Sequence, residues 1–208
     1  MGFDFLPAIF IGGILFVIVC LLAGYLTPGY SHTQQSISEL GESSAVCGWL
    51  VRWVGFVPLG LSFIVFANQT IYLFSTYMPI VFFVLIGLAI LIAGIFPTDP
   101  DNRRDTTSGK MHASAVITLL LFLSAAPFMF SIPAIYENPP SGWFLIFSFL
   151  MGMLTLTFLV FSLKGLFKRL ISPLHEMLGF QQRLLLLLHY IWWFVFSRIL
   201  AEDHTLLS

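Results

Sequence analysis

The chain has 208 residues, of which 58% are hydrophobic and 9% are charged, and its formal net charge is −1. Soluble domains carry about 25% charged residues, so this chain has too few charges to cover a water-facing globule of its size. We therefore predict an integral membrane protein surrounded by membrane lipids. The near-neutral net charge indicates no nucleic-acid partner, and 2 cysteines are too few for a disulfide framework.

Six apolar stretches are long enough to cross a membrane. A span needs about 20 predominantly apolar residues, and inside lipid each backbone polar group must be satisfied within its own segment, which favours helices. The predicted spans are residues 5–26, 48–74, 78–96, 113–135, 142–163 and 180–200. Pro58 and Pro127 lie inside spans and are expected to kink them or to free backbone carbonyls. We expect an all-α polytopic bundle that forms one membrane domain over residues 1–208.

Positive charge is concentrated at one end of the predicted bundle. We call this end the second side, because the first side carries the amino terminus; the second side carries the loops 27–47, 97–112 and 164–182. Of the 9 Lys and Arg residues, only Arg198 lies near the first side. The positive-inside rule therefore predicts that the second side is cytoplasmic and that both termini lie outside.

Residues 164–178 combine apolar residues at helical spacing with Lys164, Lys168 and Arg169. We interpret this segment as an amphipathic interfacial helix that extends the fifth span and is broken near Pro173. Such a segment anchors to anionic lipid headgroups. A role in gating a site is the alternative.

Two titratable side chains flank the loop between the third and fourth spans. Asp99 lies between Pro97 and Pro100, which restrict its backbone, and His112 lies where the fourth span begins. We predict that they form a catalytic pair, in which the carboxylate orients the imidazole and raises its basicity. The alternatives are an ordinary turn residue for Asp99 and an interfacial side chain for His112.

Four further residues are candidates for ligand binding. Ser38 and Glu39 lie in a polar loop whose alternating pattern predicts docking onto the helix ends, and a nucleophilic serine there is an alternative that no Gly-x-Ser-x-Gly elbow supports. Arg183 opens the last span, and its planar guanidinium suits a phosphate or carboxylate. His189 lies deep inside that span, where an ionisable residue is a functional hypothesis; a neutral histidine bonded to another helix is the alternative.

We expect no metal or other cofactor. His32, His112 and His175 lie on the second side together with Asp99, and three histidines with a carboxylate could hold a catalytic zinc ion. No His-x-x-x-His spacing supports that arrangement, so zinc is the less favoured hypothesis.

Four short motifs, in their order and placement, resemble the family known as domain of unknown function 998, small multispan membrane proteins of bacteria and archaea. The motifs are Ser36-Ile37-Ser38-Glu39-Leu40-Gly41 after the first span, Phe96-Pro97-Thr98-Asp99 after the third, His112 opening the fourth, and Gln182-Arg183 opening the last. This resemblance covers almost the whole chain and implies a multispan protein, which we place in a bacterial inner membrane. The family name implies no particular activity.

The Ser-Glu-Leu-Gly sequence of the first loop also resembles the Frag1/DRAM/Sfk1 group, six-span proteins linked to lipid remodelling and autophagy. In that group this loop lies on the non-cytoplasmic side, so this likeness implies the opposite orientation.

The favoured function is binding or chemical modification of a lipid or other amphiphile at the second side, where carboxylate, imidazole and guanidinium groups converge near the headgroup level. A small-molecule transporter or channel with His189 in its path is the second hypothesis. A membrane scaffold without catalytic activity is the third. The sequence leaves open whether the protein is an enzyme.

Overall fold

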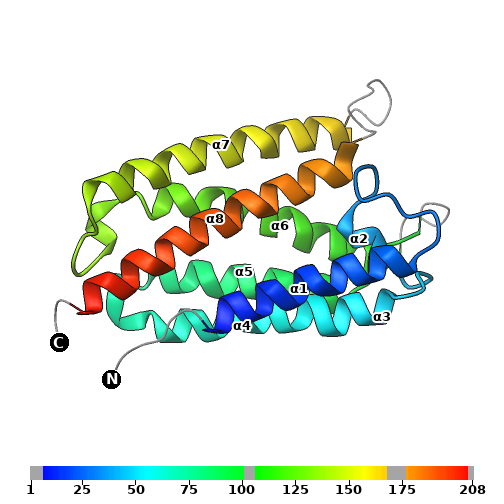
Figure 1. The fold of residues 1–208 in the computed structure, drawn as a ribbon, viewed down its shortest axis with the longest axis horizontal. Coiled ribbons are helices and arrows are strands. Elements are labelled where there is room, and N and C mark those ends of the chain that lie inside the picture. The colour runs from blue at the N-terminus through cyan, green and yellow to red at the C-terminus, as the bar shows by residue number, and fades with distance from the viewer. Residues whose placement is uncertain (1–6, 101–105, 168–176, 206–208) are drawn as a thin grey trace.

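The computed structural model describes residues 7–100, 106–167 and 177–205, and these residues form a helical bundle (Figure 1). The long helices are α1 (Pro7–Leu26), α4 (Val57–Gln69), α5 (Met78–Ile95), α6 (Thr107–Met129), α7 (Gly142–Phe167) and α8 (Leu178–Thr205). The short helical segments are α2 (Ile37–Leu40), α3 (Gly48–Leu50), the π-helical turn η1 (Val51–Phe56) and the 3₁₀ turns η2 (Ile71–Leu73) and η3 (Pro133–Ile135).

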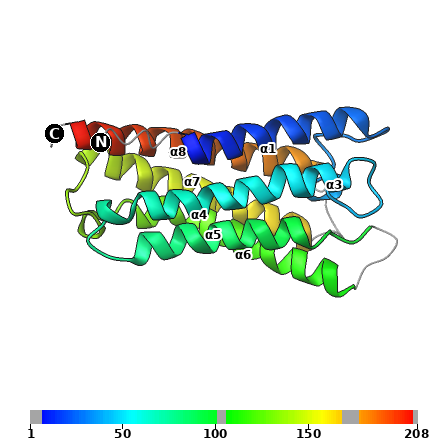
Figure 2. The same ribbon diagram turned by 90° about the horizontal axis from the view of Figure 1, so that it is seen from below.

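Successive long helices run in opposite directions through the bundle (Figures 1 and 2). The ends of α1, α5 and α7 and the starts of α3, α6 and α8 therefore lie at one end, where α2 also lies. This end is the second side of the sequence prediction. The opposite end holds η2 and η3, which an isolated antiparallel bridge between Phe74 and Tyr136 connects.

Five helical segments within the described residues are long and apolar enough to cross a membrane: Ala8–Leu26, Gly48–Gln69, Met78–Ile95, Thr107–Met129 and Gly142–Val160. The predicted all-α polytopic membrane bundle is therefore confirmed. The sixth predicted span forms α8, a helix of 28 residues that runs along the bundle but is not among the five. Its sequence is less apolar because Gln181, Gln182, Arg183 and His189 interrupt it.

The helix that follows the third loop differs from its prediction at both ends. Instead of spanning residues 113–135, α6 begins at Thr107 and ends at Met129. Thr106 caps its start by accepting a hydrogen bond from the Gly109 amide at 3.0 Å, which is how a threonine side chain satisfies a free first-turn donor. Consequently His112 lies inside a helix and not at the opening of one.

Two other boundaries also differ. In the predicted span 48–74, the α-helix ends at Gln69 and the 3₁₀ turn η2 follows. The span also contains the π-helical turn η1, where the Val57 amide, immediately before Pro58, donates to the carbonyl of Arg52. Helix α7 continues to Phe167, so the predicted interfacial segment 164–178 begins as part of that helix. Residues 168–176 of that segment lie outside the described residues.

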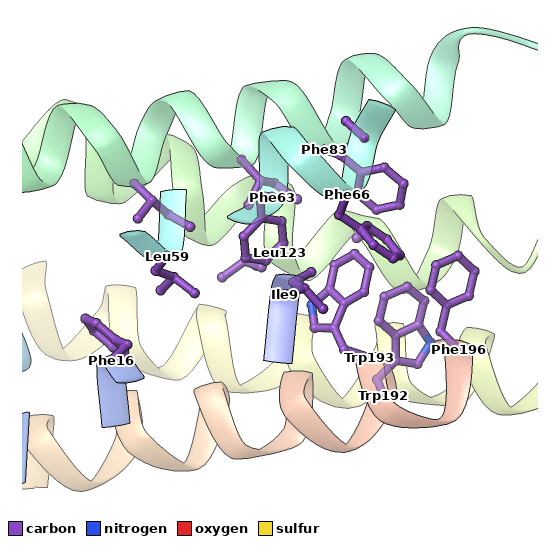
Figure 3. Close-up of a cluster of buried hydrophobic side chains, with 14 of the residues drawn as sticks. Ile9, Phe16, Leu59, Phe63, Phe66, Phe83, Leu123, Trp192, Trp193 and Phe196 are labelled. Carbon is purple, nitrogen blue, oxygen red and sulfur yellow. The ribbon is translucent and has the colours of Figure 1, made fainter. Parts of the chain in front are cut away.

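Aromatic side chains fill the first-side half of the bundle (Figure 3). The Trp192 ring stacks on Phe196, with ring centroids 5.3 Å apart and an interplanar angle of 7°. The ring centroids of Phe130 and Phe196 are 4.7 Å apart. The buried Trp192 Nε1 donates to Ser148 Oγ at 3.0 Å. Because lipid tails are as apolar as these side chains, such close packing, and not hydrophobicity, holds the helices together here.

Helices α1 and α8 lie on the same face of the bundle in both views (Figures 1 and 2). The closely packed pairs of long helices in the described part of the chain are α4–α5, α5–α6, α1–α4, α6–α7 and α7–α8. The α1–α8 pair is not among them. The backbones of α1 and α8 therefore do not approach each other closely, and side chains such as Tyr190, whose hydroxyl donates to the Gly13 carbonyl, lie between them.

Candidate functional site

The loop between α1 and α2 is docked onto the start of α8. The Phe180 amide donates to the Thr33 carbonyl at 2.9 Å, and the Ile37 amide donates to Gln182 Oε1 at 3.1 Å. Gly179 allows this approach, because a methyl group on its Cα would overlap the carbonyl oxygen of Gln35. The sequence prediction that this loop docks onto the helix ends is thus matched by its contacts.

Arg183 is the central residue of this docking. Its Nη1 donates to the carbonyls of Gln35 and Gly179 at 3.2 and 2.9 Å, and its Nη2 donates to Tyr30 Oη at 2.7 Å. The guanidinium carbon lies 5.8 Å from the centre of the Tyr30 ring. Every one of these partners is uncharged. Among the described residues, the Arg183 charge therefore has no carboxylate partner.

Tyr30 was not identified from the sequence, although it stands in the same polar segment as Ser38. Its hydroxyl donates to the Ser36 carbonyl at 2.8 Å while it accepts from Arg183. Burial raises the pKa of Tyr30, and the neighbouring Arg183 charge partly opposes that shift. The tyrosine therefore stays a neutral bridge between the loop and α8.

His32 lies on the same loop as Tyr30, near Arg183 of α8. Its ring contacts α1 so closely that a methyl group on Gly24 would overlap it, and the ring meets the Tyr30 ring edge-on at 5.1 Å. Burial, and secondarily the Arg183 charge, lower the pKa of His32. Its Nδ1 atom is buried and has no hydrogen-bond partner among the described residues. A buried polar atom without a partner is uncommon in folded proteins.

Glu39 forms a capping box with Ser36 at the start of α2. Glu39 Oε1 accepts from the Ser36 amide at 3.0 Å, and Ser36 Oγ accepts from the Glu39 amide at 3.3 Å. This reciprocal arrangement satisfies two amide donors at the helix start. One carboxylate oxygen of this predicted ligand residue is therefore engaged within the loop, where it fixes the direction of α2 and of Ser38.

His112 connects three segments of the second side. Its Nδ1 lies 2.9 Å from the carbonyls of both Ala93 and Phe96, and its Nε2 lies 3.0 Å from Ser38 Oγ. Because carbonyl oxygens only accept, Nδ1 carries a hydrogen. In the neutral ring Nε2 is then the acceptor, and the Ser38 hydroxyl donates to it. The side chain is 4% exposed.

Asp99 caps the next helix. Its carboxylate accepts from the Thr106 amide at 3.0 Å and from the Thr106 hydroxyl. The sequence analysis predicted that Asp99 orients the imidazole of His112. Both ring nitrogens of His112 have other partners, and the carbonyls of Ala93 and Phe96 at the end of α5 orient the ring. The two residues share the second side, but their hydrogen bonds lead to different groups.

His189 is buried in the middle of α8 and is 2% exposed. Its Nε2 lies 2.8 Å from the carbonyl of Leu123, and its Nδ1 lies 2.7 Å from the carbonyl of Leu185. Leu123 precedes Pro127 by four residues, and proline has no amide hydrogen to donate to that carbonyl. In the neutral tautomer whose Nε2 carries the hydrogen, His189 supplies the hydrogen bond that Pro127 removes from α6.

Two adjacent hollows lie beside these groups. The inner one has a volume of about 100 Å³ between α1, α4, α5, α6 and α8; its lining is mainly apolar, with polar contributions from Ser38, Gln182, His189 and Tyr190. The outer one has a volume of about 260 Å³ between α1 and α8; its lining is almost entirely apolar, and His32 and Arg183 are among the residues that line it. The residues that line both hollows are Phe16, Ile37, Leu186 and Tyr190.

The outer hollow reaches the lipid-facing surface of the bundle. Its apolar lining residues Val17, Leu21 and Leu187 are 41%, 57% and 54% exposed. The hollow thus has an apolar flank toward lipid. Arg183 is among its lining residues at the second side, and we call this the cationic end of the hollow.

A three-histidine zinc site was the less favoured cofactor hypothesis. The His32 ring packs on Tyr30, whereas His112 hydrogen-bonds to Ser38. The described residues contain no group of three or more His, Cys, Asp or Glu side chains that could hold a metal ion. His175, the third histidine, lies outside the described residues.

Comparison with known proteins places the chain in a family. A search of the curated proteins and a search of the solved structures each returned no significant match. Residues 10–199 match the family described as Protein of unknown function (DUF998). That match includes every motif discussed above and all the residues that line the outer hollow. The chain therefore belongs to the DUF998 family of membrane proteins of unknown function.

Proposed function

We propose that this protein binds an amphiphile with an anionic headgroup in the hollow between α1 and α8. The observation that carries the proposal is that one hollow combines an exposed apolar flank with Arg183 and His32 among its lining residues. An acyl chain suits the flank formed by Val17, Leu21 and Leu187. A phosphate or carboxylate suits the cationic end.

Electrostatics must provide most of the affinity of such a site. An acyl chain that enters the hollow leaves lipid and not water, so its burial brings little hydrophobic gain. The Arg183 charge lies among uncharged partners in a partly buried place, where an anion interacts with it more strongly than in bulk water. We therefore expect discrimination by headgroup charge.

Binding is favoured over passage through the membrane. Toward the first side the lining of the inner hollow includes Ile9, Phe63 and Trp193, and Trp193 packs there in an aromatic cluster with Trp192 and Phe196 (Figure 3). A transporter or channel needs a polar path, and this packing does not favour one. In our proposal the protein lies in a bacterial inner membrane with its second side in the cytoplasm.

Native mass spectrometry of the purified protein tests the proposal, with phosphatidylglycerol and phosphatidylcholine as competing probes. We expect preferential binding of phosphatidylglycerol. Leu187→Trp should fill the hollow without changing the Arg183 hydrogen bonds and should raise Kd at least tenfold, which corresponds to about 1.4 kcal/mol.

Arg52→Gln is the control for non-specific attraction of anionic lipids by positive charge at this end of the bundle. Arg52 lies at the same end of the bundle and its Nε donates to the Gly48 carbonyl, but it lines neither hollow. Its loss should leave phosphatidylglycerol binding unchanged. Equal binding of both lipids, or equal binding by wild type and Leu187→Trp, would contradict the proposal.

A further inference from the structure

We infer that Ser38 is a nucleophile that His112 activates, and that it cleaves an acyl ester of the amphiphile of the outer hollow when the ester group enters the adjacent inner hollow. The inference rests on the proposed function, because the amphiphile site provides the substrate, and it adds a reaction to that site. The observation behind it is the juxtaposition of the Ser38 hydroxyl, His112 Nε2 and the inner hollow, which Ser38 lines.

The geometry of the pair is that of a nucleophile and its general base. Ser38 Oγ lies 3.0 Å from His112 Nε2, within the range of about 2.6–3.2 Å that proton transfer requires. The two main-chain carbonyls that Nδ1 contacts hold the ring in the tautomer whose Nε2 is free to accept a proton. They occupy the place that a carboxylate takes in a Ser-His-Asp triad.

Ser38 is held in place independently of His112. The capping box between Ser36 and Glu39 fixes the start of α2, and Gln182 accepts from the Ile37 amide beside Ser38. The loop therefore does not need the Ser38–His112 hydrogen bond for its docking. A serine whose hydroxyl lines an apolar hollow, with a base behind it, is placed to meet an acyl carbonyl group.

The reaction balances with water as the co-reactant. Ser38 Oγ attacks the ester carbonyl carbon while its proton passes to His112 Nε2; the bond from that carbon to the alcohol oxygen breaks, and the departing oxygen takes the proton from Nε2. Water then attacks the acyl-serine, His112 accepts and returns one proton, and the free carboxylic acid leaves. Ionisation of that acid gives an anionic amphiphile, the class of molecule that suits Arg183.

The first test is labelling of the full-length protein in detergent with a long-chain alkyl fluorophosphonate, followed by peptide mass spectrometry. We expect one covalent adduct on Ser38, none in Ser38→Ala, and at least a tenfold slower reaction in His112→Asn. Ser44→Ala should label like wild type, because Ser44 is an exposed serine on the same loop that lines neither hollow.

A second variant covers the case in which His112→Asn does not fold. In Ser38→Cys, an adjacent imidazole favours the thiolate, so iodoacetamide should alkylate the introduced thiol at pH 6 at least tenfold faster than the thiol of Ser44→Cys. Equal alkylation rates would overturn the inference.

The failure of this inference can be told apart from failure of the proposed function. Wild-type protein that binds phosphatidylglycerol but gives no adduct on Ser38 would overturn the nucleophile and leave the binding site standing. Adduct formation at the wild-type rate in folded His112→Asn would overturn activation by His112. Loss of lipid discrimination in the wild type would contradict the proposed function itself.

Discussion

At the scale of single residues, the buried histidines are explained by backbone carbonyls. His112 bonds to the carbonyls of Ala93 and Phe96 near the end of α5, and His189 bonds to the carbonyl that Pro127 leaves without an amide donor. An unsatisfied carbonyl inside a membrane is costly. A single imidazole on a neighbouring helix removes that cost and joins two helices at the same time.

This pairing predicts coupled stabilities. His189→Leu should lower the free energy of unfolding by about 1–3 kcal/mol, because the Leu123 carbonyl loses its partner. In a Pro127→Ala background the loss should be smaller, since the amide of the introduced alanine can donate to that carbonyl. Thermal or denaturant unfolding in detergent measures both values, and a double-mutant cycle gives their coupling.

Pro58→Ala is the control for that cycle. Pro58 lies in α4, where η1 precedes it, so its substitution should add independently to His189→Leu. A coupling as large as that of Pro127 would contradict the specific pairing.

At the scale of elements, the docking of the α1–α2 loop onto α8 depends on glycines where backbones meet. Gly24 of α1 receives the His32 ring, and Gly179 of α8 lies against the carbonyls of His32 and Gln35. A Cβ at Gly179 would meet main-chain atoms, which cannot rotate away as a flexible side chain can. The cationic end of the outer hollow therefore depends on a close backbone approach as well as on Arg183.

Gly179→Ala should destabilise the protein by about 1–3 kcal/mol, the usual cost of overpacking, and should weaken phosphatidylglycerol binding. Gly142→Ala is the matched control, since a Cβ at Gly142 at the start of α7 would meet nothing within 4 Å. The midpoint of thermal unfolding in detergent should fall for the first variant and stay level or rise for the second. Equal midpoints would show that the loop can move aside without cost.

At the scale of the whole molecule, the candidate site residues Ser38, His112 and Arg183 lie at one end, and the largest aromatic cluster lies toward the other. The second side contains the helix caps formed by Glu39 and Asp99 and the cationic end of the outer hollow. The first-side half is filled by rings such as Phe83, Phe130 and Trp192. A rigid half and a polar half suit a site that a lipid enters from the side.

The charge distribution predicts how this molecule lies in the membrane. Because 8 of the 9 Lys and Arg residues flank the second side, both termini should be outside. Green fluorescent protein fused after Ser208 should stay dark in bacterial cells, and alkaline phosphatase fused at the same point should be active. Fluorescence of the first fusion would instead indicate the orientation that the Frag1/DRAM/Sfk1 likeness implies.

The sequence by itself determined the helical membrane bundle, most of its span positions and the set of loops that share an end. The physical reason is that a bilayer demands apolar segments of fixed length with internally satisfied backbones, so spans can be counted and loops alternate. The start of α6 was placed too late because residues 107–112 are polar for a span, while the cap at Thr106 makes them helical.

Only the tertiary structure decided how the candidate site is assembled. Apolar spans of similar composition do not encode which helices become neighbours, so the sequence placed Asp99, His112, Ser38 and Arg183 at one end without their partners. Packing of α5 on α6 supplied the carbonyls for His112, and docking of the loop on α8 engaged Arg183 with Tyr30. The hollow between α1 and α8 exists because those two helices do not pack closely, which is a property of the assembled bundle and not of any one segment.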